Sequence, residues 1–244
     1  TKQMAKKTEK EDTFYVAGIG SSAGGLEALT KLLSALPKED VPLSIVVAQH
    51  LSPSHKSHMV QLLSKNSTWE VVEASHNTTV QANKVYITPP DRDIVLKSGK
   101  IRLSRPSSEI GPKPSVNVLL ESLAAEYGPQ AIGVILSGTG RDGAEGVIQI
   151  KEAGGVIFVQ DPKTAAYDGM PVSALETRRV DLSLKAEEIG AKLIAVVKDE
   201  FKKELLDLED EGQKIASELD KIFDLLQKKT GVDFSDYKMS TIQR

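Results

Sequence analysis

Three kinds of side chain that together can hydrolyse an ester occur at separate points of this 244-residue sequence. Ser21 and Ser22 lie in FYVAGIGSSAGGLEAL, His50 ends PLSIVVAQH, and Asp142 lies in GVILSGTGRDGAEG. A serine hydroxyl can attack a carbonyl carbon, a histidine can take the hydroxyl proton, and an aspartate can hold the imidazole in the required tautomer. Their types make these residues candidates for a catalytic triad.

The three candidates follow apolar stretches that we predict to be buried strands, TFYVAGIG, PLSIVVAQH and AIGVILS. Continuously apolar strands that alternate with helices are typical of a parallel sheet covered on both faces, so we predict a doubly wound α/β fold. The carboxyl ends of such strands share one edge of the sheet, where open α/β sheets build their sites. A serine there, at the start of a helix, also has backbone N–H groups nearby that can stabilise an oxyanion.

The pattern along the chain predicts four segments. Residues 1–12 form a polar tail, 13–197 the α/β domain, 198–230 a charged helical linker and 231–244 the start of a further domain. Within the α/β domain, the period-two stretch DIVLKSGKIRLS predicts a β-hairpin that turns at Ser98 and Gly99, and we place it at an edge of the sheet.

Composition excludes several classes of protein. With no cysteine, the chain has no disulfide, thiol nucleophile or cysteine zinc site, which is consistent with a cytoplasmic location. A net charge of −3 without a basic block gives little support for nucleic-acid binding. No apolar run reaches the ~20 residues that span a bilayer, and the charged first residues do not resemble a secretory signal, so no membrane insertion is predicted.

The residues alone leave other interpretations open. Gly18, Gly20 and Ala23 match the dinucleotide-binding pattern G-x-G-x-x-A, but the second predicted strand ends in Gln49 and His50 instead of the carboxylate that would hold a ribose. A second match, GTGRDG, shows how permissive that pattern is. Each triad candidate could also serve only as a helix cap or a strand-end hydrogen-bonding group.

A metal site is the remaining alternative. His50, His55 and His58 lie close together in the sequence, but no acidic residue stands near them. We therefore predict neither a metal nor a cofactor.

Six stretches, in this order, make the sequence resemble the catalytic domain of the chemotaxis-type protein-glutamate methylesterases, the CheB family. They are IGSSAGGLEAL, AQHLSP, VYITPPDRD, PSVNVLLESLA, GVILSGTGRDGAEG and DGMPVSAL. The resemblance implies a triad of Ser22, His50 and Asp142, and so selects Ser22 over Ser21. Some members have methionine where this chain has Thr139, close to the nucleophile.

The resemblance also implies a reaction and a partner. Members hydrolyse γ-methyl esters of glutamate on the cytoplasmic helices of chemoreceptors, and some deamidate glutamine there, without metal or cofactor. Many carry a phosphorylatable receiver domain before the esterase, where this sequence has its polar tail. The final stretch GVDFSDYKMSTIQR resembles the opening of the chemoreceptor methyltransferases (CheR-like), which implies an esterase–methyltransferase fusion; we expect no methyltransferase activity from so short a segment.

Overall fold

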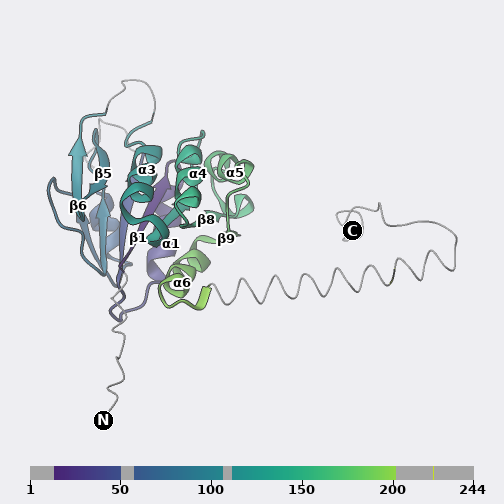
Figure 1. Ribbon diagram of the computed structural model, residues 1–244, viewed down its shortest axis with the longest axis horizontal. Coiled ribbons are helices and arrows are strands. Elements are labelled where there is room, and N and C mark those ends of the chain that lie inside the picture. Colours follow the sequence, from purple (N-terminus) through teal and green to yellow (C-terminus); the bar gives the residue numbers. More distant parts are fainter. Residues whose placement is uncertain (1–13, 51–57, 107–111, 202–221, 223–244) are drawn as a thin grey trace, which may run out of the picture. The chain divides into compact units, whose positions relative to one another are not determined.

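The computed structural model describes residues 14–50, 58–106, 112–201 and 222 (Figure 1). Backbone contacts divide the chain into two units, Thr1–Val197 and Lys198–Arg244, and every element named below belongs to the first. The predicted polar tail 1–12 and the predicted start of a further domain at 231–244 lie outside the described residues. So does the predicted linker 198–230, apart from residues 198–201 and 222.

A seven-stranded parallel sheet forms the centre of the first unit, in the order β3-β4-β2-β1-β7-β8-β9. The chain moves from the central strand β1 outward to one side and then returns to the other side through β7. This confirms the predicted doubly wound α/β fold. The strands are β1 (Tyr15–Ser21), β2 (Leu43–Gln49), β3 (Glu70–Glu73), β4 (Lys84–Ile87), β7 (Ala131–Ile135), β8 (Val156–Gln160) and β9 (Leu182–Leu184).

Helices cover both faces of the sheet, because its central strands are apolar on both sides. One layer contains α1, α2 and α6, and the other contains α3, α4 and α5, which lie side by side in Figure 1. The helices are α1 (Gly25–Ser34), α2 (Met59–Ser64), α3 (Val116–Tyr127), α4 (Ala144–Glu152), α5 (Gly169–Glu176) and α6 (Ala186–Val197), with two 3-10 turns, η1 (Gly128–Gln130) and η2 (Pro162–Thr164).

The predicted hairpin consists of β5 (Asp93–Lys97) and β6 (Lys100–Ser104). Ser98 and Gly99 form its turn with φ values of 52° and 67°, the positive values that a two-residue turn between twisted strands favours. The hairpin is a separate two-stranded sheet instead of an extension of the main sheet edge, so the predicted position needs correction. The reason is that its apolar side chains Ile94 and Leu96 are buried and β5 packs against α3 (Figure 1).

Helix α3 lies close to β1 because β1 carries glycine where the two elements meet. A Cβ atom at Gly20 would lie 2.2 Å from Cγ1 of Val116, and one at Gly18 would lie 2.3 Å from Cδ1 of Leu123. Val116 and Leu123 are fully buried. This close approach places the N-terminus of α3 at the carboxyl end of β1.

We expect Gly20→Ala to lower the free energy of unfolding by about 1–3 kcal/mol, because the new methyl group overpacks against Val116. Val116→Ala alone should also destabilise, by opening a cavity. In the double variant the smaller side chain makes room for the methyl group, so the two losses should not add. Urea unfolding of the wild type, the two single variants and the double variant gives their free energies of unfolding. Strictly additive losses would show that the two residues do not compete for the same space.

The boundary at residue 197 remains a prediction, and a truncation tests it. Helix α6 ends at Val197 and packs against α1 within the first unit. A chain that ends at Val197 should therefore unfold cooperatively at nearly the same temperature as the full chain. A thermal scan that finds no cooperative transition would move the domain boundary beyond residue 197.

Candidate active site

The three predicted residues follow neighbouring strands at one edge of the sheet. Ser22 follows β1, His50 follows β2, and Asp142 lies in the loop between β7 and α4. Hydrogen bonds continue past the strand ends and fix these segments. The N–H of His50 donates to the carbonyl oxygen of Ser21 at 3.0 Å, and the N–H of Ser22 donates to that of Ser137 at 3.0 Å.

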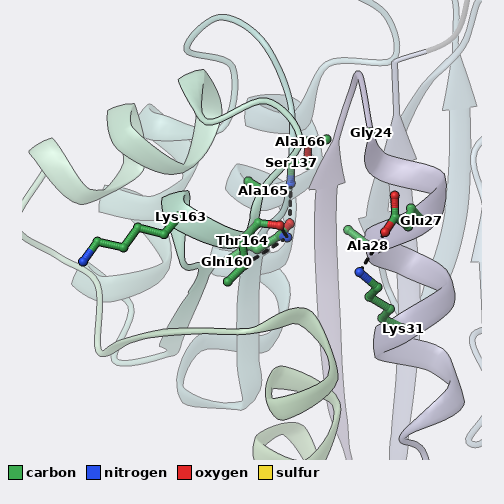
Figure 2. A pocket seen from close by; sticks show the side chains of 10 residues that line it. All are labelled: Gly24, Glu27, Ala28, Lys31, Ser137, Gln160, Lys163, Thr164, Ala165 and Ala166. Carbon is green, nitrogen blue, oxygen red and sulfur yellow. Dashed lines mark hydrogen bonds and ion pairs between the residues drawn. The ribbon is translucent and has the colours of Figure 1, made fainter.

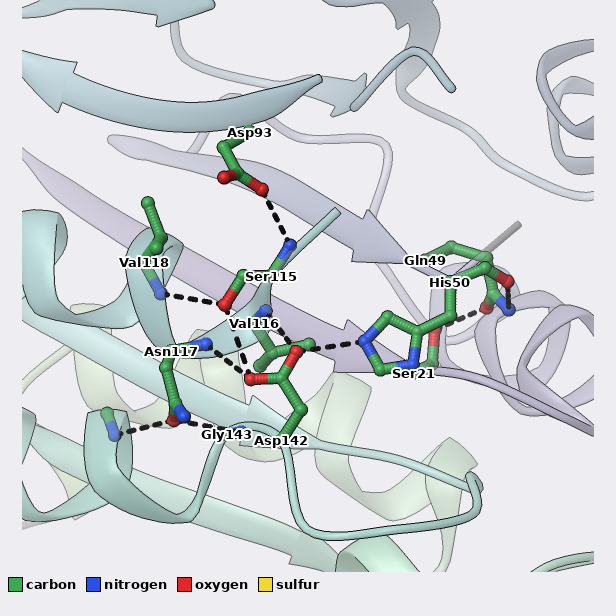
Figure 3. A network of polar contacts seen from close by, with 11 residues as sticks. Ser21, Gln49, His50, Asp93, Ser115, Val116, Asn117, Val118, Asp142 and Gly143 are labelled. Carbon is green, nitrogen blue, oxygen red and sulfur yellow. Dashed lines mark hydrogen bonds and ion pairs between the residues drawn. The ribbon is translucent and has the colours of Figure 1, made fainter. Parts of the chain in front are cut away.

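The structure brings His50 and Asp142 into direct contact. Nε2 of His50 lies 2.9 Å from Oδ2 of Asp142 (Figure 3), and the two side chains are only 8% and 10% exposed. With the carboxyl group ionised, Nε2 carries the proton and donates it to Oδ2. The lone pair of the imidazole is then on Nδ1, so this histidine can accept a proton only through Nδ1.

The Asp142 carboxylate also receives the first backbone N–H groups of α3. The N–H of Val116 donates to Oδ2 at 2.7 Å and that of Asn117 to Oδ1 at 3.0 Å, and the Ser115 hydroxyl lies 3.4 Å from Oδ1. Burial alone would raise the pKa of this carboxyl group. The hydrogen bonds from His50 and the two backbone N–H groups outweigh burial and hold the pKa below its ordinary value.

Asn117, in the first turn of α3, caps the start of helix α4 in the same way. Its side-chain oxygen Oδ1 accepts from the N–H of Gly143 at 2.9 Å and from the N–H of Gly146 at 3.0 Å, at the start of α4. Gly143 adopts φ 103°, a conformation that suits glycine. The two helices therefore cap each other: Asp142, just before α4, caps α3, and Asn117 of α3 caps α4.

A second carboxylate holds α3 from the hairpin side. Oδ1 of the buried Asp93, the first residue of β5, accepts from the N–H of Ser115 at 2.9 Å (Figure 3). The hydroxyl of Ser115 in turn accepts from the N–H of Val118 as the N-cap of α3. The start of α3 is thus fixed from two directions, and the position of Asp142 follows from it.

Ser21 and Ser22 have different environments. The fully buried hydroxyl of Ser21 donates to Oε1 of Gln49 at 2.5 Å, and Nε2 of Gln49 donates to the carbonyl oxygens of Ser22 at 2.7 Å and His50 at 3.0 Å. Gln49 therefore ties the turn after β1 to the end of β2. Ser22, by contrast, is only partly buried and lines a groove of about 500 Å³ beside α1 and α2.

Ser22 stands beside the histidine–aspartate pair without being joined to it. Ser21 pairs with Gln49 in the β1–β2 register, so Ser22 and His50 are the next residues along the two chains. In the part of the chain that the structure describes, no hydrogen bond links the Ser22 hydroxyl to His50. Hydrogen bonds of a catalytic site often tighten only when substrate binds.

A second hollow, of about 260 Å³, lies between α1 and η2 (Figure 2). Its polar groups bond one another: Oε1 of Gln160 accepts from the N–H of Ser137 at 2.8 Å, and its Nε2 donates to the carbonyl oxygen of Thr164 at 3.2 Å. Lys31 pairs with Glu27 at 2.7 Å. These contacts hold the loop after β8 in place, and we assign no chemistry to this hollow.

Two further sequence observations concern residues near the site. Thr139, in the loop that carries Asp142, is exposed. Of the three histidines considered as metal ligands, His55 lies outside the described residues, and Nδ1 of His58 lies 3.3 Å from Oε1 of Gln61 on α2. Across the residues that are described, no three histidine, aspartate or glutamate side chains gather in one place. In the same residues, no helix is both long and apolar enough to cross a membrane.

Sequence reasoning missed the residues that support the pair. In the sequence, Gln49 is notable only because it stands where a dinucleotide-binding fold would have a carboxylate. Asn117, Ser115 and Asp93 are not predicted to belong to the site. A serine just before an apolar helical pattern is a recognisable N-cap signal and could have identified Ser115. The contacts of Gln49 and Asn117 join segments far apart in the sequence, so no local signal marks them.

Comparison with known proteins gives consistent matches. The family described as CheB methylesterase matches residues 17–193. A protein-glutamate methylesterase/protein-glutamine glutaminase 2 of Anaeromyxobacter dehalogenans is 41% identical over 178 residues, which cover 73% of this chain and 52% of that protein. A protein-glutamate methylesterase/protein-glutamine glutaminase of Pyrococcus horikoshii is 32% identical over 200 residues, which cover 80% of this chain and 54% of that protein. The chain thus spans about half the length of these two relatives.

A solved structure matches the fold as well. The crystal structure of the Thermotoga maritima CheB methylesterase catalytic domain superimposes with a TM-score of 0.70 at 33% sequence identity. The match covers 75% of this chain and 99% of the other. The family match extends over most of the first unit, from β1 to α6. The chain therefore belongs to the CheB methylesterase family.

Proposed function

We propose that this protein is a serine hydrolase that removes methyl esters from glutamate side chains of chemoreceptors, giving glutamate and methanol. The contact between His50 and Asp142 carries the proposal, because it joins a base and its orienting carboxylate at the carboxyl edge of the sheet, beside Ser22. The names of the two relatives specify protein-glutamate methylesterase activity for those proteins.

Ser22 is the proposed nucleophile. The Ser21 hydroxyl is buried and committed to Gln49, whereas Ser22 lines an open groove. Ser21 is the last residue of β1, whereas Ser22 begins the turn that leads to α1, so the two serines have different environments. The resemblance to the family supports the same assignment.

Proton transfer in the proposed mechanism runs through Nδ1 of His50. Nδ1 takes the Ser22 proton as the hydroxyl oxygen attacks the ester carbonyl carbon, while Nε2–H remains bonded to the ionised Asp142. The positive imidazolium that forms is stabilised by that carboxylate. In the usual serine-protease arrangement the aspartate bonds Nδ1 and the serine faces Nε2, so here the two nitrogens exchange roles.

The remaining steps need only backbone groups and water. The N–H of Gly25 is bonded to the Ser22 carbonyl oxygen at 2.9 Å, so the N–H groups of Ala23 and Gly24, before α1, are the proposed oxyanion donors. When the tetrahedral intermediate collapses, the methoxide takes the proton from His50 and leaves as methanol. Water, deprotonated by His50, then attacks the acyl-enzyme and releases the glutamate carboxylate and the free Ser22 hydroxyl.

Deamidation of glutamine is a second proposed activity, because both relatives carry that activity in their names. The same attack on a side-chain amide forms the same acyl-enzyme and releases ammonia in place of methanol. Both reactions need an unprotonated His50 and no metal or cofactor.

The context of the reaction also remains a proposal. Chemoreceptor helices are the proposed partner and the cytoplasm the proposed location, as the resemblance implies. The methyltransferase-like domain proposed to begin at 231–244, after the linker 198–230, would bring the opposing activity into the same polypeptide.

We expect Ser22→Ala to reduce methanol release from a methylated chemoreceptor by roughly a thousandfold or more, because no other hydroxyl replaces the nucleophile. Ser21→Ala should keep a substantial fraction of the rate, although the lost partner of Gln49 should lower the free energy of unfolding by about 1–3 kcal/mol. Full activity in a folded Ser22→Ala protein would exclude Ser22 as the nucleophile.

Asp142→Asn should lower both activity and stability, and the stability effect should depend on pH. The carboxylate has a lowered pKa in the folded protein, so its stabilisation is present above the unfolded-state value of about 3.9 and is lost as pH falls through the folded value. At neutral pH the variant should lose about 1–3 kcal/mol, since the N–H groups of Val116 and Asn117 lose a charged acceptor.

The measurement is denaturant unfolding of both proteins between neutral and strongly acidic pH. The difference in free energy of unfolding between the wild type and Asp142→Asn should narrow as pH falls below the unfolded-state pKa of about 3.9. Glu27→Gln, on the exposed Glu27–Lys31 pair of α1, is the matched control and should change little at any pH. A difference that does not narrow between about pH 4 and strongly acidic pH would contradict the lowered pKa inferred for Asp142.

A further inference from the structure

Large apolar side chains that remain exposed lie in segments that follow the carboxyl ends of the strands, the edge of the sheet where Ser22 lies. Within residues 14–201 as described, they are Leu26 at 36%, Leu62 at 42%, Tyr167 at 50% and Val172 at 37% exposed. Each lies in a segment that follows the carboxyl end of β1, β2 or β8, at the edge of the sheet that holds His50 and Asp142. Single exposed apolar residues need no explanation, but apolar residues gathered around one site mark an interaction surface.

The first pair lies on the α1–α2 side. Leu26 in the first turn of α1 and Leu62 on α2 line the same groove as Ser22, with the buried Met59 between the helices. The groove has a volume of about 500 Å³, enough for one large apolar side chain and its neighbours. Its apolar wall is thus continuous with the proposed nucleophile.

The second pair lies on the other side of Ser22. Tyr167 is fixed to the loop after β7, because its N–H donates to the Ser137 hydroxyl at 3.0 Å and its carbonyl oxygen accepts from the N–H of Gly138 at 3.0 Å. A Cβ atom at Gly138 would lie 2.9 Å from Cβ of Ser22, so the loop after β7 lies directly against Ser22. Val172 follows on α5. Because β2 and β8 lie on opposite sides of β1, the two pairs flank Ser22.

We propose that these four side chains form an apolar rim that binds apolar residues on both sides of the esterified glutamate in a helix of the protein substrate. The proposal rests on the function proposed above and adds what the surface recognises besides the ester. Residues three or four positions apart share one face of a helix, so a glutamyl ester that points at Ser22 places its neighbours one turn away toward either pair. Continuity with Ser22 identifies the occupant as the substrate itself.

The test compares two helical peptides, each with one glutamate γ-methyl ester. One peptide has leucine four residues before and four residues after the ester, and the other has serine at both positions, with equal helicity verified by circular dichroism. Methanol release by the full 244-residue protein gives kcat/KM for each peptide. We expect the leucine peptide to be preferred about tenfold, since burying parts of two leucines accounts for a factor of that order.

Variants assign the preference to the rim. Leu62→Ser and Tyr167→Ser should each reduce the preference about threefold or more, while the rate on p-nitrophenyl acetate stays unchanged because Ser22, His50 and Asp142 are intact. Leu62→Met should restore the preference, and Ala125→Ser, on an exposed position near the far end of α3, should keep it.

Equal values of kcat/KM for the two peptides would contradict the proposed role of the rim. Rim variants that slow hydrolysis of both peptides and of p-nitrophenyl acetate alike would also contradict it. A rim variant that keeps the preference but changes the oligomeric state in solution would also overturn it, because the surface would then bind a second copy. Failure of the proposed function gives a different result: the wild type releases no methanol from either peptide.

Discussion

The carboxylate of Asp142 occupies the point where helix α3 begins, and the geometry of the site follows from what it binds there. It accepts from the N–H groups of Val116 and Asn117 and from Nε2 of His50. A helix leaves its first N–H groups without partners inside the helix, so it presents fixed donors to an anion. The fold thereby fixes the direction of both carboxylate oxygens before any substrate binds.

Asn117 makes this arrangement reciprocal, because it accepts from Gly143 and Gly146 while its own N–H donates to Asp142. The loop that carries Asp142 cannot move without breaking caps on both helices. Removing one partner would leave buried donors or acceptors unsatisfied, which costs more than the net stabilisation of an average hydrogen bond. Among the described residues, no buried side-chain nitrogen or oxygen lacks a partner. The caps therefore stabilise the fold and hold His50 in one tautomer at the same time.

Most of the fold could be predicted from the sequence, because its signals are local. Apolar stretches ending at residues such as Gln49 and Ile135 gave the central strands, and the Ser98–Gly99 turn gave the hairpin. The position of the hairpin could not be predicted, because it depends on burial against α3. Strand β3 has only four residues and little apolar alternation, so it was missed.

The candidate site, like the fold, has features that the sequence predicts and features that depend on three-dimensional packing. His50, Asp142 and the two serines Ser21 and Ser22 could be named because parallel strands end at a common edge, whereas the choice of Ser22 came from the resemblance to the family. The structure brings His50 and Asp142 together. Which ring nitrogen of His50 faces Asp142 could not be predicted, because the contact joins residues that are 92 positions apart in the sequence. The close approach of α3 to β1 depends in the same way on a distant pair, Gly20 and Val116. The sequence contains the glycine, but only the three-dimensional packing reveals which side chain fills the space beside it.

The two adjacent serines show how one strand separates structure from chemistry. Ser21 and Gln49 are paired in register, so their side chains meet within the layer covered by α1, where each satisfies the other. The next residues along the two chains are Ser22, which lines the groove beside α1 and α2, and His50, whose Nε2 meets Asp142. Gln49 then holds the backbone of these two residues, because its Nε2 donates to the carbonyl oxygens of Ser22 and His50. A hydroxyl that must react cannot also be a structural donor, and the neighbouring residues Ser21 and Ser22 separate the structural hydroxyl from the proposed nucleophile.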